Sequence, residues 1–144
     1  MAEILFKKKG LGTFLKLMGG IYVNRDAHDF SFINKSEEIL AKGGVVGTFP
    51  ESRIPRPGEE TPLEFKTSTA YLALLSNTDI IPLYTDGVYF KWARARVIIG
   101  KPLRIADIVK EDLSDKENIE LINTALRNKI IELKGLLDER KQKK

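Results

Sequence analysis

The chain has 144 residues, 42% of them hydrophobic and 31% charged, which is typical of one soluble globular domain and excludes a disordered chain. Its net charge of +4 and pI near 9.2 favour anionic partners such as phosphorylated metabolites, membrane surfaces or nucleic acid. The chain has no cysteine and one histidine, which excludes thiol catalysis, disulfide bonds and metal sites built from cysteines or several histidines. No apolar run reaches the roughly 20 residues of a membrane-spanning helix.

The N-terminal segment, residues 3–18, mixes apolar and basic residues. Apolar side chains recur every three or four positions between Leu11 and Met18, which predicts a helix. Two interpretations remain open for it: an ordinary core helix, or an amphipathic segment that lies on an anionic membrane surface. Two glycines end this helix, and residues 20–25 predict a strand.

The rest of the chain alternates between helices and short apolar strands. Helices are predicted at 31–42, 66–77 and 114–140, and strands at 45–49, 79–85 and 95–100. This alternation predicts an α/β fold with a mostly parallel central sheet flanked by helices, in a single domain over residues 1–144. Ligand sites in such sheets lie at the carboxyl ends of strands, so the loop after residues 45–49 is the predicted site.

Residues 114–140 carry the clearest helical pattern in the chain. Ser114 and Glu117 have the spacing of a capping box, in which each side chain bonds the backbone N–H of the other residue. Apolar residues at spacings of three and four predict one buried face along the whole helix. They are Ile119, Ile122, Leu126, Ile130, Leu133 and Leu137.

The loop after residues 45–49 reads FPESRIPRPG and combines prolines with charges. Arg25 ends one predicted strand and Arg53 follows the next, so in a parallel sheet both would lie at the same rim. Two such guanidinium groups would form a phosphate site. Glu51 would hold Arg53 in place or bind a substrate hydroxyl; the alternative is that these residues are solvated loop charges.

Lys66 opens the helix predicted at 66–77, whose first turn offers backbone N–H groups to an anion. The alternative is an ordinary solvated lysine. His28 lies in a polar, turn-like stretch, and the simplest interpretation is a surface residue. Neither a Walker-type phosphate loop nor a GxGxxG motif is present.

Four stretches, in this order, resemble the glycerolipid acyltransferases typified by 1-acylglycerol-3-phosphate acyltransferase: GGIYVNRD, GGVVGTFPESR, PLEFKTSTAYLAL and DIIPLYTDG. The resemblance implies transfer of a fatty acyl group, in phospholipid synthesis, to the free hydroxyl of 1-acylglycerol-3-phosphate. The donor would be acyl-CoA or the thioester of acyl carrier protein, and no cofactor is implied. The resemblance also implies a cytoplasmic protein that is peripheral to the inner membrane face.

The resemblance also implies roles for single residues. Arg25 would bind the acceptor phosphate, Glu51 and Arg53 would bind the acceptor, and Pro82 would help to shape the acyl or acceptor site. Ser52 stands where the family pattern has glycine. The predicted substrate-binding set is therefore Arg25, Glu51, Ser52, Arg53, Lys66 and Pro82.

The catalytic motif of this family, His-x-x-x-x-Asp, is missing from the chain. Five residues after His28 is Ile33, and His28 follows the Arg25 stretch, whereas the family motif precedes it. We therefore expect an N-terminally truncated acyltransferase domain with no catalytic base, no metal, and little or no activity alone. The alternative is a non-catalytic module that binds anionic lipid through its phosphate; nucleic acid is disfavoured because the basic residues are not interleaved with aromatic ones.

Overall fold

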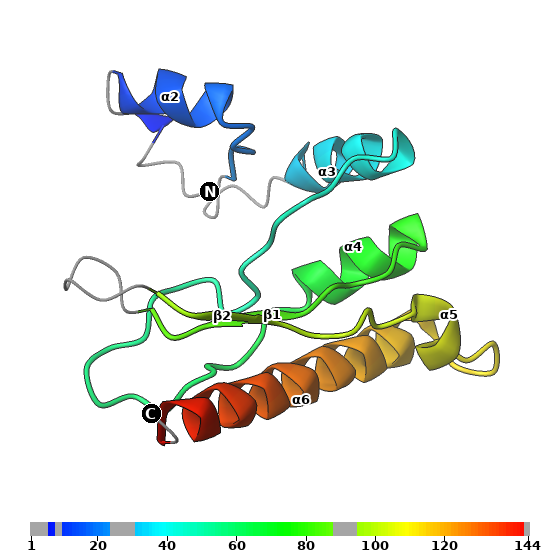
Figure 1. Ribbon diagram of the computed structural model, residues 1–144. Coiled ribbons are helices and arrows are strands. Elements are labelled where there is room, and N and C mark those ends of the chain that lie inside the picture. The colour runs from blue at the N-terminus through cyan, green and yellow to red at the C-terminus, as the bar shows by residue number, and fades with distance from the viewer. Residues whose placement is uncertain (1–5, 8–9, 24–30, 88–94, 143–144) are drawn as a thin grey trace. The chain divides into compact units, whose positions relative to one another are not determined.

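The computed structural model describes residues 6–7, 10–23, 31–87 and 95–142 (Figure 1). The chain divides into two compact units, residues 1–47 and residues 48–144, which are considered separately below. Whether both belong to a single domain stays a prediction. Within the described ranges, none of the helices combines the length and the apolar character needed to cross a membrane.

The first unit contains the helices α2 (Leu11–Leu17) and α3 (Ser31–Ala41). Helix α3 confirms the helix predicted at 31–42, and it ends where Gly43 adopts a φ of +76° and donates to the Leu40 carbonyl oxygen. Helix α2 confirms the helix predicted between Leu11 and Met18, and Gly10, with a φ of +84°, immediately precedes it. Residues 20–23 form no strand beyond a single bridge position, contrary to the prediction.

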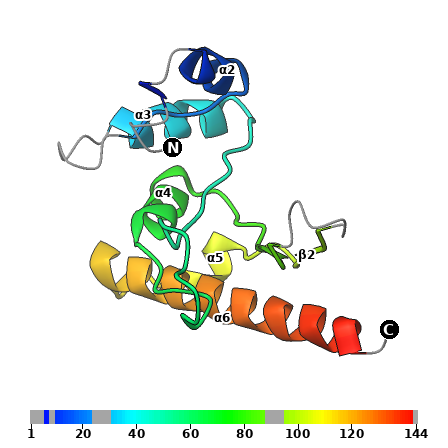
Figure 2. The same cartoon turned by 90° about the vertical axis from the view of Figure 1, so that its left-hand side faces the viewer.

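The second unit contains α4 (Ser68–Ser76), β1 (Leu83–Thr85), β2 (Val97–Ile99), α5 (Ile105–Ile108) and α6 (Asp115–Gln142). Helix α6 is its longest element, and α4, α5 and both strands pack against it (Figures 1 and 2). The capping box is confirmed: Glu117 Oε2 accepts from the Ser114 N–H (2.9 Å), and Ser114 Oγ accepts from the Glu117 N–H (3.4 Å).

The described sheet differs from the mostly parallel central sheet that was predicted. It has two strands, β1 and β2, which pair in antiparallel fashion with Tyr84 opposite Ile98. The connection between them spans only residues 86–96, and a parallel pair needs a longer crossover that usually contains a helix. Residues 45–49 form no strand here, and Val45 and Phe49 are about nine-tenths exposed.

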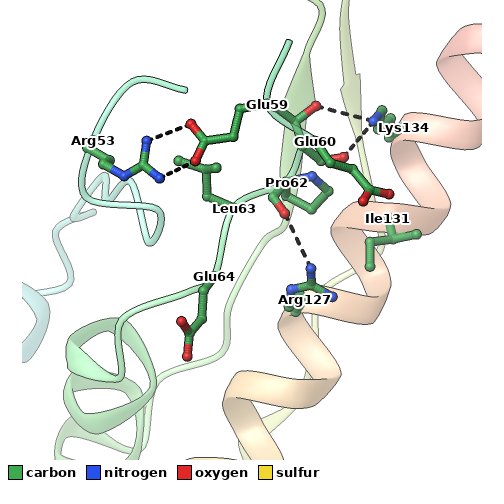
Figure 3. A pocket seen from close by; sticks show the side chains of 10 residues that line it. Arg53, Glu59, Glu60, Pro62, Leu63, Glu64, Arg127, Ile131 and Lys134 are labelled. Carbon is green, nitrogen blue, oxygen red and sulfur yellow. Dashed lines mark hydrogen bonds and ion pairs between the residues drawn. The ribbon is translucent and has the colours of Figure 1, made fainter. Parts of the chain in front are cut away.

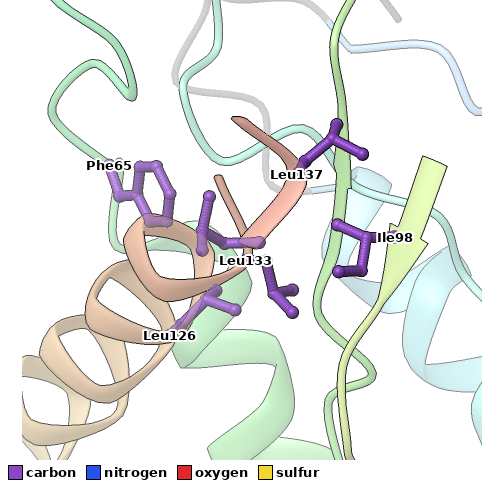
Figure 4. Packing of buried hydrophobic residues seen from close by; sticks show 6 residues of the cluster. Phe65, Ile98, Leu126, Leu133 and Leu137 are labelled. Atoms are coloured by element: carbon purple, nitrogen blue, oxygen red, sulfur yellow. The ribbon is translucent and has the colours of Figure 1, made fainter. Parts of the chain in front are cut away.

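The core of the second unit follows the apolar face of α6, as predicted. Leu126, Leu133 and Leu137 pack with Phe65 and Ile98, and all five are at most 8% exposed (Figure 4). A second cluster joins α6 to α4 and α5 through Ala70, Ala73, Ile105 and Ile122. The segment before α4 and the strand β2 are therefore both held against α6.

Candidate functional site

The loop that contains Glu51 begins with a tight turn. The Ser52 N–H donates to the Phe49 carbonyl oxygen (3.0 Å), and the Arg53 N–H donates to the Glu51 carbonyl oxygen (2.7 Å). Ser52 has a φ of +58°, in the left-handed region that glycine enters without steric cost. This conformation gives a physical reason why glycine suits the position of Ser52 in the family pattern.

The Glu51 side chain points to the core side of the loop. Its Oε2 atom accepts a hydrogen bond from the backbone N–H of Leu63, at 2.8 Å. Glu51 is half-buried and Leu63 is 7% exposed. Among the described residues, no other group donates a hydrogen bond to the Glu51 carboxylate, so its Oε1 atom accepts none from them.

Arg53 is paired with Glu59. The sequence had suggested Glu51 as a partner of Arg53, and the structure does not show that pair. The Arg53 Nη1 and Nη2 atoms donate to Glu59 Oε2 (2.8 Å) and Oε1 (2.5 Å), and the two side chains are 49% and 31% exposed (Figure 3). The hydrogen bond from Arg53, with a second one from the Arg56 backbone N–H, lowers the pKa of Glu59 to about 2. The same pairing raises the pKa of Arg53.

Of the other predicted site residues, the structure describes Lys66 and Pro82. Lys66 precedes α4 rather than opening it; its N–H donates to the Pro50 carbonyl oxygen (2.9 Å) and its side chain is exposed. Pro82 is fully buried, so it belongs to the core beside Gly100 and not to the loop surface. Arg25 lies outside the described residues, so its predicted convergence with Arg53 stays a prediction. His28 also lies outside them.

A hollow of about 570 Å³ separates the loop from α6 (Figure 3). It is lined by Arg53, Glu59, Glu60, Thr61, Pro62, Leu63, Glu64, Arg127, Ile131 and Lys134. Glu59, Arg127 and Lys134 were not predicted from the sequence. A signal was present for the two on α6, because they are seven residues apart and so lie on one helix face, beside the apolar stripe.

The arrangement suits a polar ligand, and no histidine lies among the residues that the structure describes. It offers one carboxylate oxygen, an exposed guanidinium and the polar rim of the hollow, which suit a hydroxyl and an anion. Among the residues that the structure describes, no cluster of three or more histidine, cysteine, aspartate or glutamate side chains could hold a metal ion.

Comparison with known proteins agrees with the resemblance drawn from the sequence motifs. A family model described as Acyltransferase matches residues 1–86. A protein of Bacillus subtilis (strain 168), "1-acyl-sn-glycerol-3-phosphate acyltransferase", is 31% identical over 140 residues, covering 94% of this chain and 67% of that protein. No solved structure matches. The match to the family model includes the loop of Glu51 and Arg53 but not α6, and together these findings show that the chain belongs to the Acyltransferase family.

Proposed function

We propose that this chain acts in the transfer of a fatty acyl group from a thioester to the free hydroxyl of 1-acylglycerol-3-phosphate. In this reaction the hydroxyl oxygen forms an ester bond with the acyl carbon, the C–S bond breaks, and the thiol of coenzyme A or acyl carrier protein leaves with the proton. The observation that carries the proposal is the match of the family model across residues 1–86, which contain the FPESR loop.

The acceptor would bind at this loop. Arg53 and Arg25 would hold its phosphate, because a guanidinium group can donate two parallel hydrogen bonds to phosphate oxygens. Glu51 Oε1 would accept a hydrogen bond from the acceptor hydroxyl. The exposed guanidinium of Arg53 and the available oxygen of Glu51 support this assignment. Ser52, Lys66 and Pro82 complete the proposed substrate-binding set, with Pro82 acting from the core.

In the family pattern, the histidine of a His-x-x-x-x-Asp motif takes the proton from the acceptor hydroxyl. No such motif occurs in the 144 residues. The chain by itself would therefore bind the acceptor and transfer acyl groups slowly or not at all, since loss of such a base costs orders of magnitude in rate. A module that only binds anionic lipid is the alternative function, and the same missing motif favours it.

The enzyme would work at the cytoplasmic face of the inner membrane, from which both the acceptor and acyl-CoA or acyl carrier protein are accessible. Helix α2 and its C-cap residue support this with exposed apolar side chains at Phe14, Leu17 and Met18 and with Lys16 beside them. A larger, mostly parallel sheet also stays part of the proposal. The exposed apolar residues at 45–49 are of the kind that a central sheet would bury.

The test measures thiol release from a long-chain acyl-CoA in the presence of lysophosphatidic acid. The chain is compared with a version extended at its N-terminus by a family-type His-x-x-x-x-Asp segment. Transfer by the extended version alone is the expected result. Arg53→Ala should then raise the KM for the acceptor, whereas Arg56→Ala, three residues away in the same exposed loop, should leave it unchanged. Lysolipid binding without transfer by either version would favour the binding module.

A further inference from the structure

Side chains of α6 bind the backbone of residues 61–65. Lys134 Nζ donates hydrogen bonds to the carbonyl oxygen and to Oγ1 of Thr61, at 2.5 and 3.2 Å. About two helical turns away, Arg127 Nη2 donates to the carbonyl oxygen of Pro62, at 3.3 Å (Figure 3). Two half-buried cations thus contact two successive backbone carbonyl groups.

A third donor lies further along the same helix. Asn123 Nδ2 donates to the carbonyl oxygen of Phe65, at 3.3 Å. Lys134 bonds the start of the 61–65 segment, and Asn123, which comes earlier on α6, bonds its end. The segment therefore runs antiparallel to α6. The phenyl ring of Phe65 is buried against the helix, so apolar contacts reinforce the polar ones.

The same segment contains the backbone N–H that donates a hydrogen bond to the Glu51 carboxylate. The N–H of Leu63, which lies between Pro62 and Phe65 in the chain, donates to Glu51 Oε2 at 2.8 Å. A continuous path of contacts therefore leads from α6 to the Glu51 carboxylate. It consists of the α6 donors, the backbone of residues 61–65, and the Leu63 N–H.

Neither cation on this path has a carboxylate partner among the described residues. Arg127 and Lys134 bond only backbone carbonyl groups and the Thr61 hydroxyl. By contrast, Lys129 on the same helix pairs with Glu132 at 2.7 Å. Hydrogen bonds from charged donors are stronger than those between neutral groups, so the contacts of Arg127 and Lys134 are well suited to fix the segment.

We propose that Asn123, Arg127 and Lys134 are positioning residues for Glu51. By fixing residues 61–65, they fix the Leu63 N–H, which holds one carboxylate oxygen and leaves Oε1 directed to the acceptor hydroxyl. The identity of the acceptor rests on the function proposed above. The position of Glu51 does not rest on that function, because it can be measured without any substrate. Helix α6, which lies beyond the residues matched by the family model, thereby becomes part of the acceptor site.

The first measurement is hydrogen exchange of the Leu63 amide by NMR in the full chain. Arg127→Ala and Lys134→Ala should each speed this exchange by about tenfold or more, because the segment loses an attachment to α6. Lys134→Arg keeps a charged donor and should retain most of the protection. Lys129→Ala is the matched control on the same helix and should leave the exchange unchanged. Helix content by circular dichroism identifies any variant that fails to fold.

The second measurement is binding of glycerol 3-phosphate, a water-soluble probe for the acceptor headgroup. Arg127→Ala should weaken it by roughly three- to tenfold, and should cause no further loss once Glu51→Ala is present, since coupled residues are not additive. Equal losses in both backgrounds, or unchanged Leu63 exchange in Arg127→Ala and Lys134→Ala, would overturn the positioning role. If the unmodified chain does not bind the probe, the proposed acceptor is wrong, and the Leu63 exchange alone decides this inference.

Discussion

Glu51 and Arg53 are two residues apart, yet different parts of the molecule hold them. The Glu51 carboxylate is bonded to the Leu63 N–H, in a segment that packs on α6 and its apolar core. The Arg53 guanidinium is bonded to Glu59, in the same exposed loop. The carboxylate is thus coupled to the stability of the core, whereas the arginine can change its partner without disturbing the fold.

This difference suits the two roles proposed for these residues. A carboxylate that meets a reacting hydroxyl must be held within a narrow range of positions. An arginine that binds phosphate must be able to leave its carboxylate partner, and both partners accept the same two parallel hydrogen bonds. If Arg53 binds the acceptor phosphate as proposed, Glu59 takes up the same two donors when no acceptor is bound.

The largest expected effect on stability comes from the hydrophobic core against which the segment that binds Glu51 packs. Leu133 is 3% exposed and belongs to the cluster on α6, so Leu133→Ala should lower the free energy of unfolding by about 2 to 5 kcal/mol. Urea denaturation measures this. Leu136→Ala, at a position 40% exposed on the same helix, should cost about 1 kcal/mol or less. Similar losses for both variants would contradict the packing of α6 described here.

A smaller effect is expected when Glu51 itself is changed. Glu51→Ala leaves the N–H of the buried Leu63 without an acceptor, which should cost about 1 to 3 kcal/mol of stability. Glu51→Gln keeps a side-chain carbonyl oxygen at this place and should recover most of the loss. Arg53→Ala should shift the thermal midpoint only slightly, because its partner lies in the same exposed loop. A larger shift for Arg53→Ala than for Glu51→Ala would reverse the comparison.

Local patterns predicted much of the second unit. The apolar stripe and the capping box place α6 correctly because both depend on spacings within one helix. The FPESR motif led to the prediction that Glu51 and Arg53 bind the acceptor, and that role stays a prediction. These features need no knowledge of distant residues.

The predictions that were wrong, and the residues that were missed, depend on contacts between residues far apart in the sequence. The direction of strand pairing could not be read from two apolar runs, although the short connection between 79–85 and 95–100 was a usable signal. Glu59 was missed as the partner of Arg53 because several carboxylates in the loop were equivalent by sequence. The role of Arg127 requires knowing that residues 61–65 lie along α6, which no motif reveals.

The Arg53 pairing is tested more sharply by ligand binding than by stability. Glu59→Gln removes the charge that competes with phosphate, so glycerol 3-phosphate should bind several-fold more tightly, with an unchanged thermal midpoint. Glu60→Gln is the control, because Glu60 lines the same hollow without contacting Arg53. Calorimetric titration measures both. Weaker binding in Glu59→Gln would mean that Glu59 orients Arg53 for phosphate instead of competing with it.

The smallest expected effect is the pH dependence of the same pairing. Folding lowers the pKa of Glu59 from 4.5 to about 2, chiefly through the hydrogen bond from Arg53. Its contribution to stability is therefore complete above about pH 4.5 and is lost as the pH falls toward 2. Because the pair is exposed, salt and solvent screen it, and the change in stability in this window should be slight.

NMR titration of the Glu59 carboxyl carbon detects the shift directly. The midpoint should lie near 2 in the unmodified chain. It should rise toward 4.5 in Arg53→Ala, because this change removes the hydrogen bond that lowers the pKa of Glu59 most. In Arg56→Ala the midpoint should stay low, because the backbone N–H of residue 56 still donates to Glu59. A midpoint near 4.5 in the unmodified chain would mean that Arg53 is not paired with Glu59 in solution, and Arg53 would then need no exchange of partners to bind phosphate.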